Sequence, residues 1–237
     1  QVDKALNGEK ERKQIMQDLS FSFPTPHFQL GGFEFSVLIY TFRNVYAPDE
    51  AQMTVEQPGD TLWAEGKGLR WAGGQMEMPG RFEVRACICS NGIRVKTTAE
   101  IQNAGEDIRC IKVIVHGIPD GKLVNLINAQ PREIPQEGLN LKYPEGWRDV
   151  GTPLVVMQTP ENEMFYFRSL DEKVRDKRFV FVRTGDKLNA ELIFEEAAVS
   201  MTNRIDAPEW EIGWGKNLAE IYESHRLHVE KCYGLVP

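Results

Sequence analysis

His116 is the side chain in this sequence best suited to acid-base chemistry. An imidazole gains or loses its charge near neutral pH, so it can give or take a proton during a reaction. Strand alternation in segment 108–116 places it on one face with Cys110, Lys112 and Ile114. Catalysis would also need a carboxylate within reach, for which the sequence offers Glu195, Glu196 and Glu211. The alternative is a structural strand histidine whose hydrogen bonds are satisfied by a neighbour.

Aromatic and cationic side chains suited to a polyhydroxylated ligand gather in segment 119–153. Tyr143 and Trp147 offer flat apolar surfaces, and Arg132 offers several donors in a planar fork. The segment holds five of the 13 prolines, which predicts a long loop, and such loops in compact domains are often functional. We therefore predict that these three residues contact a ligand. The alternative is that Tyr143 and Trp147 hold the loop against its own sheet or a neighbouring domain.

Arg168 is the fourth predicted ligand-binding residue. It shares a strand face with Tyr166, so its guanidinium could stand on the same sheet surface as His116. The segment that follows, 171–178, is predicted to be a solvated hairpin turn. Trp63 is a further aromatic residue that could either stack on a ligand or pack inside the protein.

The sequence predicts no metal site and no cofactor. His225 and His228 are three residues apart, a spacing that can bring two imidazoles to one metal ion, but a third ligand is missing. Phosphate-binding glycine-rich loops, nucleophile elbows and paired-cysteine motifs are absent from the sequence. The four cysteines suggest no disulfide framework, which slightly favours a cytoplasmic over a secreted or periplasmic location. A bond between Cys87 and Cys110 on adjacent strands stays open.

Charge and hydropathy exclude two classes of partner. The 237 residues include 28 basic and 35 acidic side chains, giving a formal net charge of −7, with both signs mixed along the chain. Such a chain lacks the positive field that attracts nucleic acid. No apolar run approaches the ~18 residues that a membrane helix needs. We therefore predict neither nucleic acid nor a membrane as a partner, and one large domain, because no polar linker divides the chain.

Strand patterns predict an all-β fold, a large antiparallel β-sandwich spanning residues 20–215. In segment 81–118, alternating strands flank Asn91-Gly92, which is a strong hairpin signal, and a third strand follows after a short turn. Short joins predict an antiparallel meander here and a second one after residue 153. Residues 1–19 are predicted to form an arm or helix. Residues 216–237 are predicted to form a helix, with Asn217 as its N-cap.

Three segments together resemble a known family. They are the hairpin around Asn91-Gly92, the run "AEIQNAGEDIRCIKVIVHGIP" and the run "SMTNRIDAPEWEIGW". The arrangement resembles the galactose-mutarotase-like super-sandwich that forms the N-terminal domain of bacterial multidomain glycoside hydrolases. The resemblance implies that residues 216–237 are a linker to a catalytic barrel outside this chain. In mutarotases a Tyr-Phe-Asn run follows the catalytic histidine, whereas Gly117, Ile118 and Pro119 follow His116.

These observations leave three functions open. In the leading hypothesis the sandwich supports or shapes the sugar cleft of a glycoside hydrolase, and this chain alone is not catalytic. Its partners would be a carbohydrate and a C-terminal catalytic domain or partner chain. The second hypothesis is a free-standing sugar epimerase or mutarotase that uses His116. The third is a carbohydrate-binding module that uses Trp147, Tyr143 or Trp63 as a stacking platform.

Overall fold

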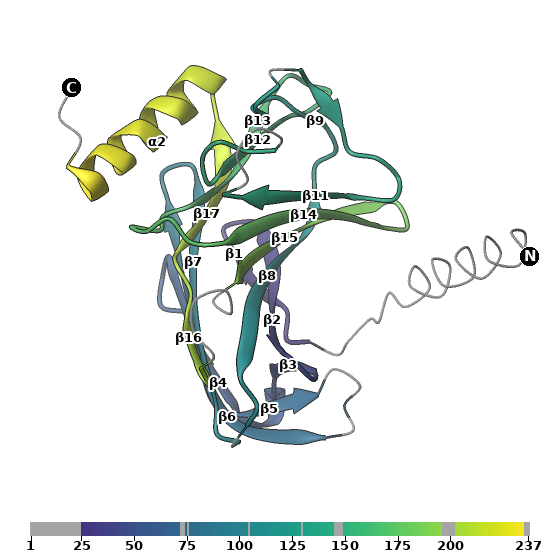
Figure 1. Cartoon of the computed structure of the whole chain (residues 1–237), viewed down its shortest axis with the longest axis vertical. Coiled ribbons are helices and arrows are strands. Elements are labelled where there is room, and N and C mark those ends of the chain that lie inside the picture. The colour runs from purple at the N-terminus through teal and green to yellow at the C-terminus, as the bar shows by residue number, and fades with distance from the viewer. Residues whose placement is uncertain are drawn as a thin grey trace, which may run out of the picture.

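The computed structural model describes residues 25–71, 74, 76–103, 105–128, 130–144, 149–195 and 202–234. It is mostly antiparallel β-sheet (57% strand) with an α-helix at the C-terminal end, which confirms the predicted all-β class (Figure 1). The predicted arm, residues 1–19, lies outside the described residues. The elements are β1 (Phe28–Leu30), β2 (Phe33–Thr41), β3 (Val45–Pro48), η1 (Glu50–Gln52), β4 (Met53–Glu56), β5 (Thr61–Trp71), β6 (Glu77–Cys89), β7 (Gly92–Ile101), β8 (Ile108–Ile118), β9 (Lys122–Leu123), β10 (Arg132–Glu133), β11 (Leu139–Tyr143), β12 (Leu154–Gln158), β13 (Met164–Ser169), β14 (Lys177–Thr184), β15 (Lys187–Glu195), β16 (Arg204–Asp206), β17 (Trp210–Gly215) and α2 (Leu218–Tyr233).

The strands form two antiparallel layers that share a corner. In the layer that we call the front sheet, β2, β8, β15, β14 and β11 lie side by side, with β1 along the edge of β2. The back sheet runs from β4 through β5, β6, β7, β17, β13, β12 and β9 to β10, with β16 also beside β7. Strand β3 pairs with both β2 and β5 and thereby joins the two sheets.

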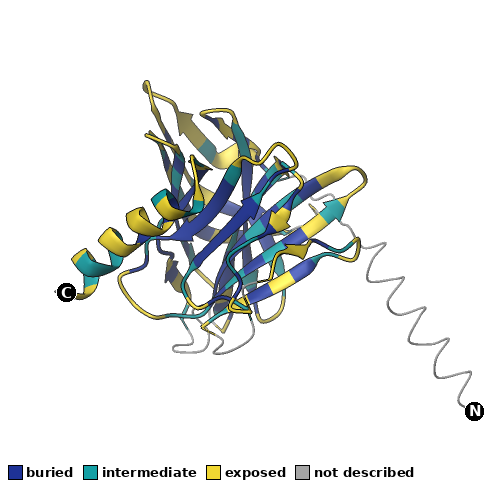
Figure 2. Ribbon diagram, turned by 90° about the horizontal axis from the view of Figure 1, so that it is seen from above, coloured by how far each residue is buried: buried dark blue, intermediate teal, exposed yellow. Residues whose placement is uncertain are grey.

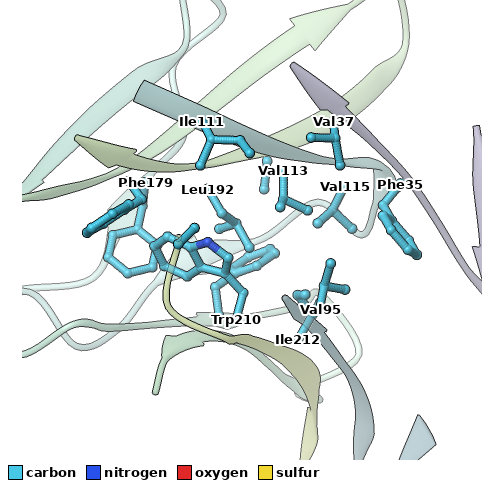
Figure 3. Close-up of a cluster of buried hydrophobic side chains, with 14 of the residues drawn as sticks. Phe35, Val37, Val95, Ile111, Val113, Val115, Phe179, Leu192, Trp210 and Ile212 are labelled. Atoms are coloured by element: carbon cyan, nitrogen blue, oxygen red, sulfur yellow. The ribbon is translucent and has the colours of Figure 1, made fainter. Parts of the chain in front are cut away.

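The hydrophobic core lies between the inner faces of the two sheets. Its fully buried side chains include Val37, Val113 and Leu192 from the front sheet and Val95 and Ile212 from the back sheet. Figure 3 shows side chains from both sheets pointing toward one another. Trp210 packs edge-on against Phe179, with ring centroids 5.6 Å apart. Figure 2 shows the same burial in dark blue through the middle of the molecule. Period-2 alternation therefore gives each sheet one apolar inner face and one outer face that is free for function.

The predicted meanders are correct in the pairing within each hairpin. They are wrong in placing the strand that follows each hairpin next to it in the same sheet. Strands β6 and β7 pair around Asn91-Gly92 as predicted. Strand β8, however, pairs with β2 and β15 in the front sheet and not with β7. In the second half, β13 pairs in the back sheet while β14 pairs in the front sheet. Alternation reveals one buried face per strand but not which of two facing sheets the strand joins.

A buried carboxylate lies where the chain crosses from β7 to β8. Glu106 is 4% exposed, and its Oε1 accepts hydrogen bonds from Tyr46 Oη at 2.8 Å and Thr41 Oγ1 at 3.0 Å. Burial and the Glu106 carboxylate raise the pKa of Tyr46 to about 12. The turn is thereby tied to the corner formed by β2 and β3, which directs β8 into the front sheet.

Two further predictions about local structure are wrong. Segment 119–153 is not one long loop, because β9 and β10 extend the back sheet and β11 forms the edge of the front sheet. Segment 171–178 is not a solvated turn. Lys177 is fully buried, and its Nζ lies 2.7 Å from Oδ2 of buried Asp171. Arg175 also binds the Asp171 carboxylate, with Nη2 2.8 Å from Oδ1. Buried ion pairs inside a charged segment cannot be predicted from a sequence pattern that treats every charged residue as exposed.

The C-terminal helix begins and ends at the predicted signals. Asn217 Oδ1 accepts the N–H of Glu220 at 2.9 Å, and Gly234 closes the helix with φ of 62°. Helix α2 packs through Ile221 on Leu154, Val156 and Tyr166 of the back sheet, while most of its length is exposed (Figure 2). It is therefore attached along one narrow stripe.

The cysteines are free among the described residues. Cys87 lies on β6 in the back sheet and Cys110 on β8 in the front sheet, so the bond left open between adjacent strands is not formed. Within the described residues, no helix is long and apolar enough to cross a membrane.

Candidate functional site

His116 lies at a bulge on the outer face of the front sheet. Strand β8 places two residues, His116 and Gly117, opposite the single residue Asn189 of β15. Gly117 has φ of 61°, and its N–H donates to Asn189 Oδ1 at 3.0 Å. A bulge bends its strand and redirects side chains, and bulges are frequent beside active sites. His116 thus sits where the regular sheet is interrupted.

The strand register sets a carboxylate beside His116. Glu34 of β2 is its direct cross-strand partner. His27 Nδ1 donates to Glu34 Oε1, and this hydrogen bond lowers the pKa of Glu34. The His27 ring stacks on the His116 ring, with centroids 4.5 Å apart and an interplanar angle of 8°. Two imidazoles and one carboxylate therefore form a single cluster.

The imidazole of His116 is held and kept neutral. Its Nε2 is hydrogen-bonded to Ser36 Oγ at 2.8 Å. Burial and then the neighbouring His27 lower the pKa of His116. A neutral ring has one donor and one acceptor nitrogen, and Nδ1 makes no hydrogen bond to another described residue. His116 can therefore exchange one further hydrogen bond with a ligand.

Glu34, His116 and Gly117 border a pocket of about 440 Å³ at the end of the front sheet, which we call the His116 pocket. Its other charged walls are Asp120, Arg183, Asp186 and Lys187. Arg183 Nη2 donates to Asp120 Oδ1 at 2.9 Å, which lowers the pKa of Asp120. Lys187 has no ion-pair partner in the part of the chain that the structure describes. The pocket offers carboxylate acceptors and cationic donors together, and its volume falls in the range of roughly 300–1,000 Å³ that small-molecule sites occupy.

The polar surface continues from the His116 pocket along the outer face of the front sheet. Lys112 Nζ lies 2.7 Å from Glu191 Oε2 and 4.6 Å from the ring centroid of Tyr40. Farther along, Arg178 Nε donates to Glu195 Oε2 at 2.9 Å. These groups satisfy one another, so the residues with free hydrogen-bonding capacity are those at the bulge.

The structure does not gather the predicted site residues into one cluster. Arg168 lies on the outer face of the back sheet, and not on the surface of His116 as predicted. Tyr143, at the end of β11, packs against the core, with Lys177 Nζ 5.4 Å from its ring centroid. Arg132 is exposed on β10, and Trp147 lies outside the described residues.

One link connects the Arg132 segment to the His116 pocket. Arg183, which lines the pocket, approaches the main-chain oxygen of Ile134 at 3.4 Å. The segment that carries Arg132 therefore contacts a residue of the pocket lining, but Arg132 itself is not part of that lining.

The residues that sequence reasoning missed are Glu34, His27, Asp120, Arg183, Asp186 and Lys187. The acids that the sequence predicts for His116 are Glu195, Glu196 and Glu211. Glu195 is paired with Arg178, Glu211 lies on the back sheet, and Glu196 is outside the described residues. The available signal was the alternation of Glu34 and Ser36 with Phe33 and Phe35, which places both polar side chains on the outer face of β2.

Arg168 belongs to a buried ionic row beneath α2. Glu211 is directly opposite Arg94 on one side and Arg168 on the other. Its carboxylate accepts from Arg168 Nη2 at 2.5 Å, Arg94 Nε at 2.8 Å and Tyr166 Oη at 2.8 Å. Burial alone would raise the pKa of Glu211, but the charge of Arg168 and these hydrogen bonds outweigh burial and lower it. All the charged groups of the row contact one another, and of its buried polar atoms only Arg168 Nε lacks a hydrogen-bond partner among the described residues, which makes the row a structural feature rather than an open site.

Helix α2 covers this row. It contributes one hydrogen bond to the row, through Ser224, and a buried histidine, His225, without a hydrogen-bond partner among the described residues. Arg168 Nη1 donates to Ser224 Oγ at 3.0 Å. His225 is 4% exposed, and neither ring nitrogen has a hydrogen-bond partner among the described residues. Burial, and then the charges of Arg168 and His228, lower the pKa of His225 to about 4. Docked α2 therefore requires a neutral His225.

We expect the protein to lose stability as the pH falls from 6.5 toward 4. His225 takes up a proton near pH 6.5 when unfolded but only near pH 4 when folded, so the unfolded state binds more protons in this window. The expected loss is roughly 2–3 kcal/mol in the free energy of unfolding. Urea melts at several pH values test it with His225→Leu, which should flatten the slope. An unchanged slope in the variant would assign the effect to other groups, such as His228, whose pKa is also lowered by burial.

The described residues contain no group of three His, Cys, Asp or Glu side chains placed to hold a metal ion. The candidate site is a polar pocket of small-molecule size, located at a bulge in the front sheet of a two-sheet antiparallel sandwich.

Comparison with known proteins gives only distant similarities. No protein-family model and no curated protein matches the chain. The GH36 alpha-galactosidase AgaA from Geobacillus stearothermophilus is 11% identical with a TM-score of 0.44, covering 80% of this chain and 29% of that chain. A double variant of AgaA in complex with raffinose has a TM-score of 0.46 with the same identity and coverage. Slr1438 from Synechocystis sp. PCC 6803 is 9% identical with a TM-score of 0.35, covering 81% of this chain and 75% of that chain. The chain spans 29% of the alpha-galactosidase chain, and the function proposed below rests on the residues of the site.

Proposed function

We propose that this chain is the sandwich domain of a carbohydrate-active protein and that the His116 pocket is its sugar-facing surface. The observation that carries the proposal is the direct pairing of Glu34 with His116 at a bulge that borders the pocket. A carboxylate and a neutral imidazole exchange hydrogen bonds with hydroxyl groups, and Lys187 supplies a cationic donor. A small number of convergent polar groups around a concave site is the usual design for small-molecule recognition.

The wider role that we propose is to shape the sugar cleft of a glycoside hydrolase whose catalytic domain lies elsewhere in the same protein or in a partner chain. The resemblance in the segments around Asn91-Gly92, His116 and Trp210 supports this role. An open pocket of this kind supplies only part of the contacts of a bound sugar. We therefore expect millimolar rather than micromolar affinity for a simple hexose in the isolated chain.

Ligand-observed NMR and calorimetry with methyl galactoside, methyl glucoside and methyl mannoside test the proposal. We expect at least one of these sugars to bind, and Glu34→Gln or His116→Ala to weaken that binding by about tenfold or more, because each removes a central hydrogen bond. Glu77→Gln, an exposed carboxylate on the back sheet, is the matched control and should leave affinity unchanged. Equal affinity in the wild type and both pocket variants would contradict the proposal.

A second candidate function, sugar mutarotation, is favoured by the presence of two titrating side chains in one pocket. Opening a pyranose ring requires an acid that protonates the ring oxygen and a base that takes the proton of the anomeric hydroxyl. Ionised Glu34 fits the role of the base. His116 fits the role of the acid only in its protonated form, and the lowered pKa of His116 makes that form the minor one at neutral pH. NMR exchange between the anomers of galactose measures the reaction directly. Acceleration over buffer that is lost in His116→Ala would support catalysis, and exchange at the buffer rate would leave binding as the function.

A further inference from the structure

A second polar groove lies on the outer face of the back sheet, which faces away from the front sheet that carries the His116 pocket. It encloses about 650 Å³ and lies across β4, β5, β6, β7 and β16. Residues that are cross-strand partners on neighbouring strands form rows that run across the sheet. The groove and its rim are formed by three adjacent rows, which are described in turn below.

The middle row contains a carboxylate, Glu65, that forms no ion pair with any described residue. Thr54, Glu65, Glu83 and Thr98 are successive cross-strand partners in this row. Glu65 stands directly opposite Glu83, an arrangement of like charges that destabilises a sheet. Glu83 is compensated by Arg85, whose Nε lies 2.7 Å from Oε1. Glu65 has no ion-pair partner in the part of the chain that the structure describes, so its oxygens are available to hydrogen-bond donors of a ligand.

The row on one side of the carboxylates presents an aromatic surface. Trp63 is the cross-strand partner of Arg85 and is 36% exposed. It stands beside the groove rather than among its lining residues, on the same strand face as Glu65, which does line the groove, two residues and about 7 Å away. An exposed indole beside polar groups matches the two sides of a pyranose ring, because the C–H face of the sugar packs on the ring while its hydroxyls reach the carboxylate.

The row on the other side lies at a second bulge. Strand β6 places Gly80 and Arg81 opposite the single residue Lys67 of β5, which turns Arg81 and Lys67 into the groove. Gly66 forms part of the lining, and a Cβ there would come within 2.4 Å of the Phe82 ring. The close approach of Phe82 therefore requires glycine at this position. Glu100 and Arg204 complete the row across β7 and β16.

We propose that this groove binds an extended, uncharged oligosaccharide or polysaccharide chain, with Trp63 as the stacking platform and Glu65 as the central acceptor. The proposal rests on the proposed function in that it takes the protein to be carbohydrate-active, but it concerns a different sheet and a different size of ligand. A groove that crosses five strands is longer than a single sugar ring. The mixture of carboxylates and guanidinium groups disfavours a polyanion such as nucleic acid.

Affinity electrophoresis in gels that contain xyloglucan, galactomannan, arabinogalactan or soluble starch tests the proposal. The wild-type chain should be retarded by at least one of them. Trp63→Ala should weaken that retention by about tenfold or more, as truncation of a central aromatic contact does at other interfaces. Glu65→Gln should weaken it less, because the amide keeps one acceptor oxygen. Phe42→Ala, an aromatic residue that is 56% exposed outside the groove, is the matched control and should bind as the wild type does.

The outcomes separate this groove from the His116 pocket. Retention that is lost in Trp63→Ala and unchanged in His116→Ala supports the groove, even where the monosaccharide experiments fail. Retention that is lost in His116→Ala but unchanged in Trp63→Ala overturns the groove and leaves the proposed function standing. Mobility of the wild type that none of the four polysaccharides alters also overturns it. Circular dichroism of each variant ensures that a loss of binding is not a loss of fold.

Discussion

Glu211→Ala is expected to lower the free energy of unfolding by about 3–5 kcal/mol. The substitution leaves the guanidinium of Arg168, which is 4% exposed beneath α2, without its carboxylate partner. It also removes the acceptor of the buried Tyr166 hydroxyl. Breaking a buried ion pair costs more than the pair contributes, because the remaining charge stays desolvated. Urea unfolding monitored by tryptophan fluorescence measures the loss.

The matched control for this prediction is Arg226→Ala on the outer side of α2. Arg226 is paired with Glu223 and Glu230 at the surface, where its own side chain is half-exposed, so its removal should leave the urea midpoint nearly unchanged. A Glu211→Ala variant whose midpoint moves no further than that of the control would show that the row beneath α2 is solvated. The account of Arg168 as a buried structural residue would then be wrong.

Ending the chain at Gly215 is expected to cost about 3–5 kcal/mol while leaving a sharp unfolding transition. The deletion removes Ile221 and uncovers Leu154 and Val156, which are fully buried in the intact chain. Full burial of such a side chain contributes about 1.5–3 kcal/mol. The transition should stay cooperative because α2 supplies no strand and no side chain to the main core between the sheets.

A urea melt of the shortened chain distinguishes the two roles left open for α2. Leu227→Ala, which changes a residue that is 54% exposed on α2, is the control and should melt as the wild type does. A sharp transition at a lower midpoint supports a helix that is accessory to the sandwich, as a linker would be. A broad transition without a clear midpoint would instead make α2 an integral layer of the domain.

The sequence predicts strands and hairpins well and the layering poorly, for a physical reason. Period-2 alternation and the Asn91-Gly92 turn depend on neighbours along the chain, so β6, β7 and the cap at Asn217 follow directly. The placement of β8 beside β2 depends on contacts made by Glu106 with Tyr46 and Thr41, roughly sixty residues away. Such contacts between distant segments leave no periodic signal.

The same reason explains which parts of the site were predictable. His116 could be selected because its chemistry is carried by the residue type and its strand face by local alternation. Its partner Glu34 could not, because the pairing depends on the register between β2 and β8. The charge of Arg168 makes it a candidate for ligand binding, but burial against Glu211 turns that charge into a structural contact. Charge in a sequence therefore identifies candidates, and register decides which of them face a ligand.

The most direct test of the His116 pocket is the titration of the histidine Cε1–Hε1 NMR signals with methyl galactoside, methyl glucoside and methyl mannoside. All four imidazoles are observable in one spectrum: His27 and His116 lie at the front sheet, and His225 and His228 lie on α2. We predict that the signals of His116 and His27, which stack at 4.5 Å, shift in a saturable manner with at least one sugar, while those of His225 and His228 stay in place. Signals of His116 and His27 that remain unmoved by all three sugars would contradict the account.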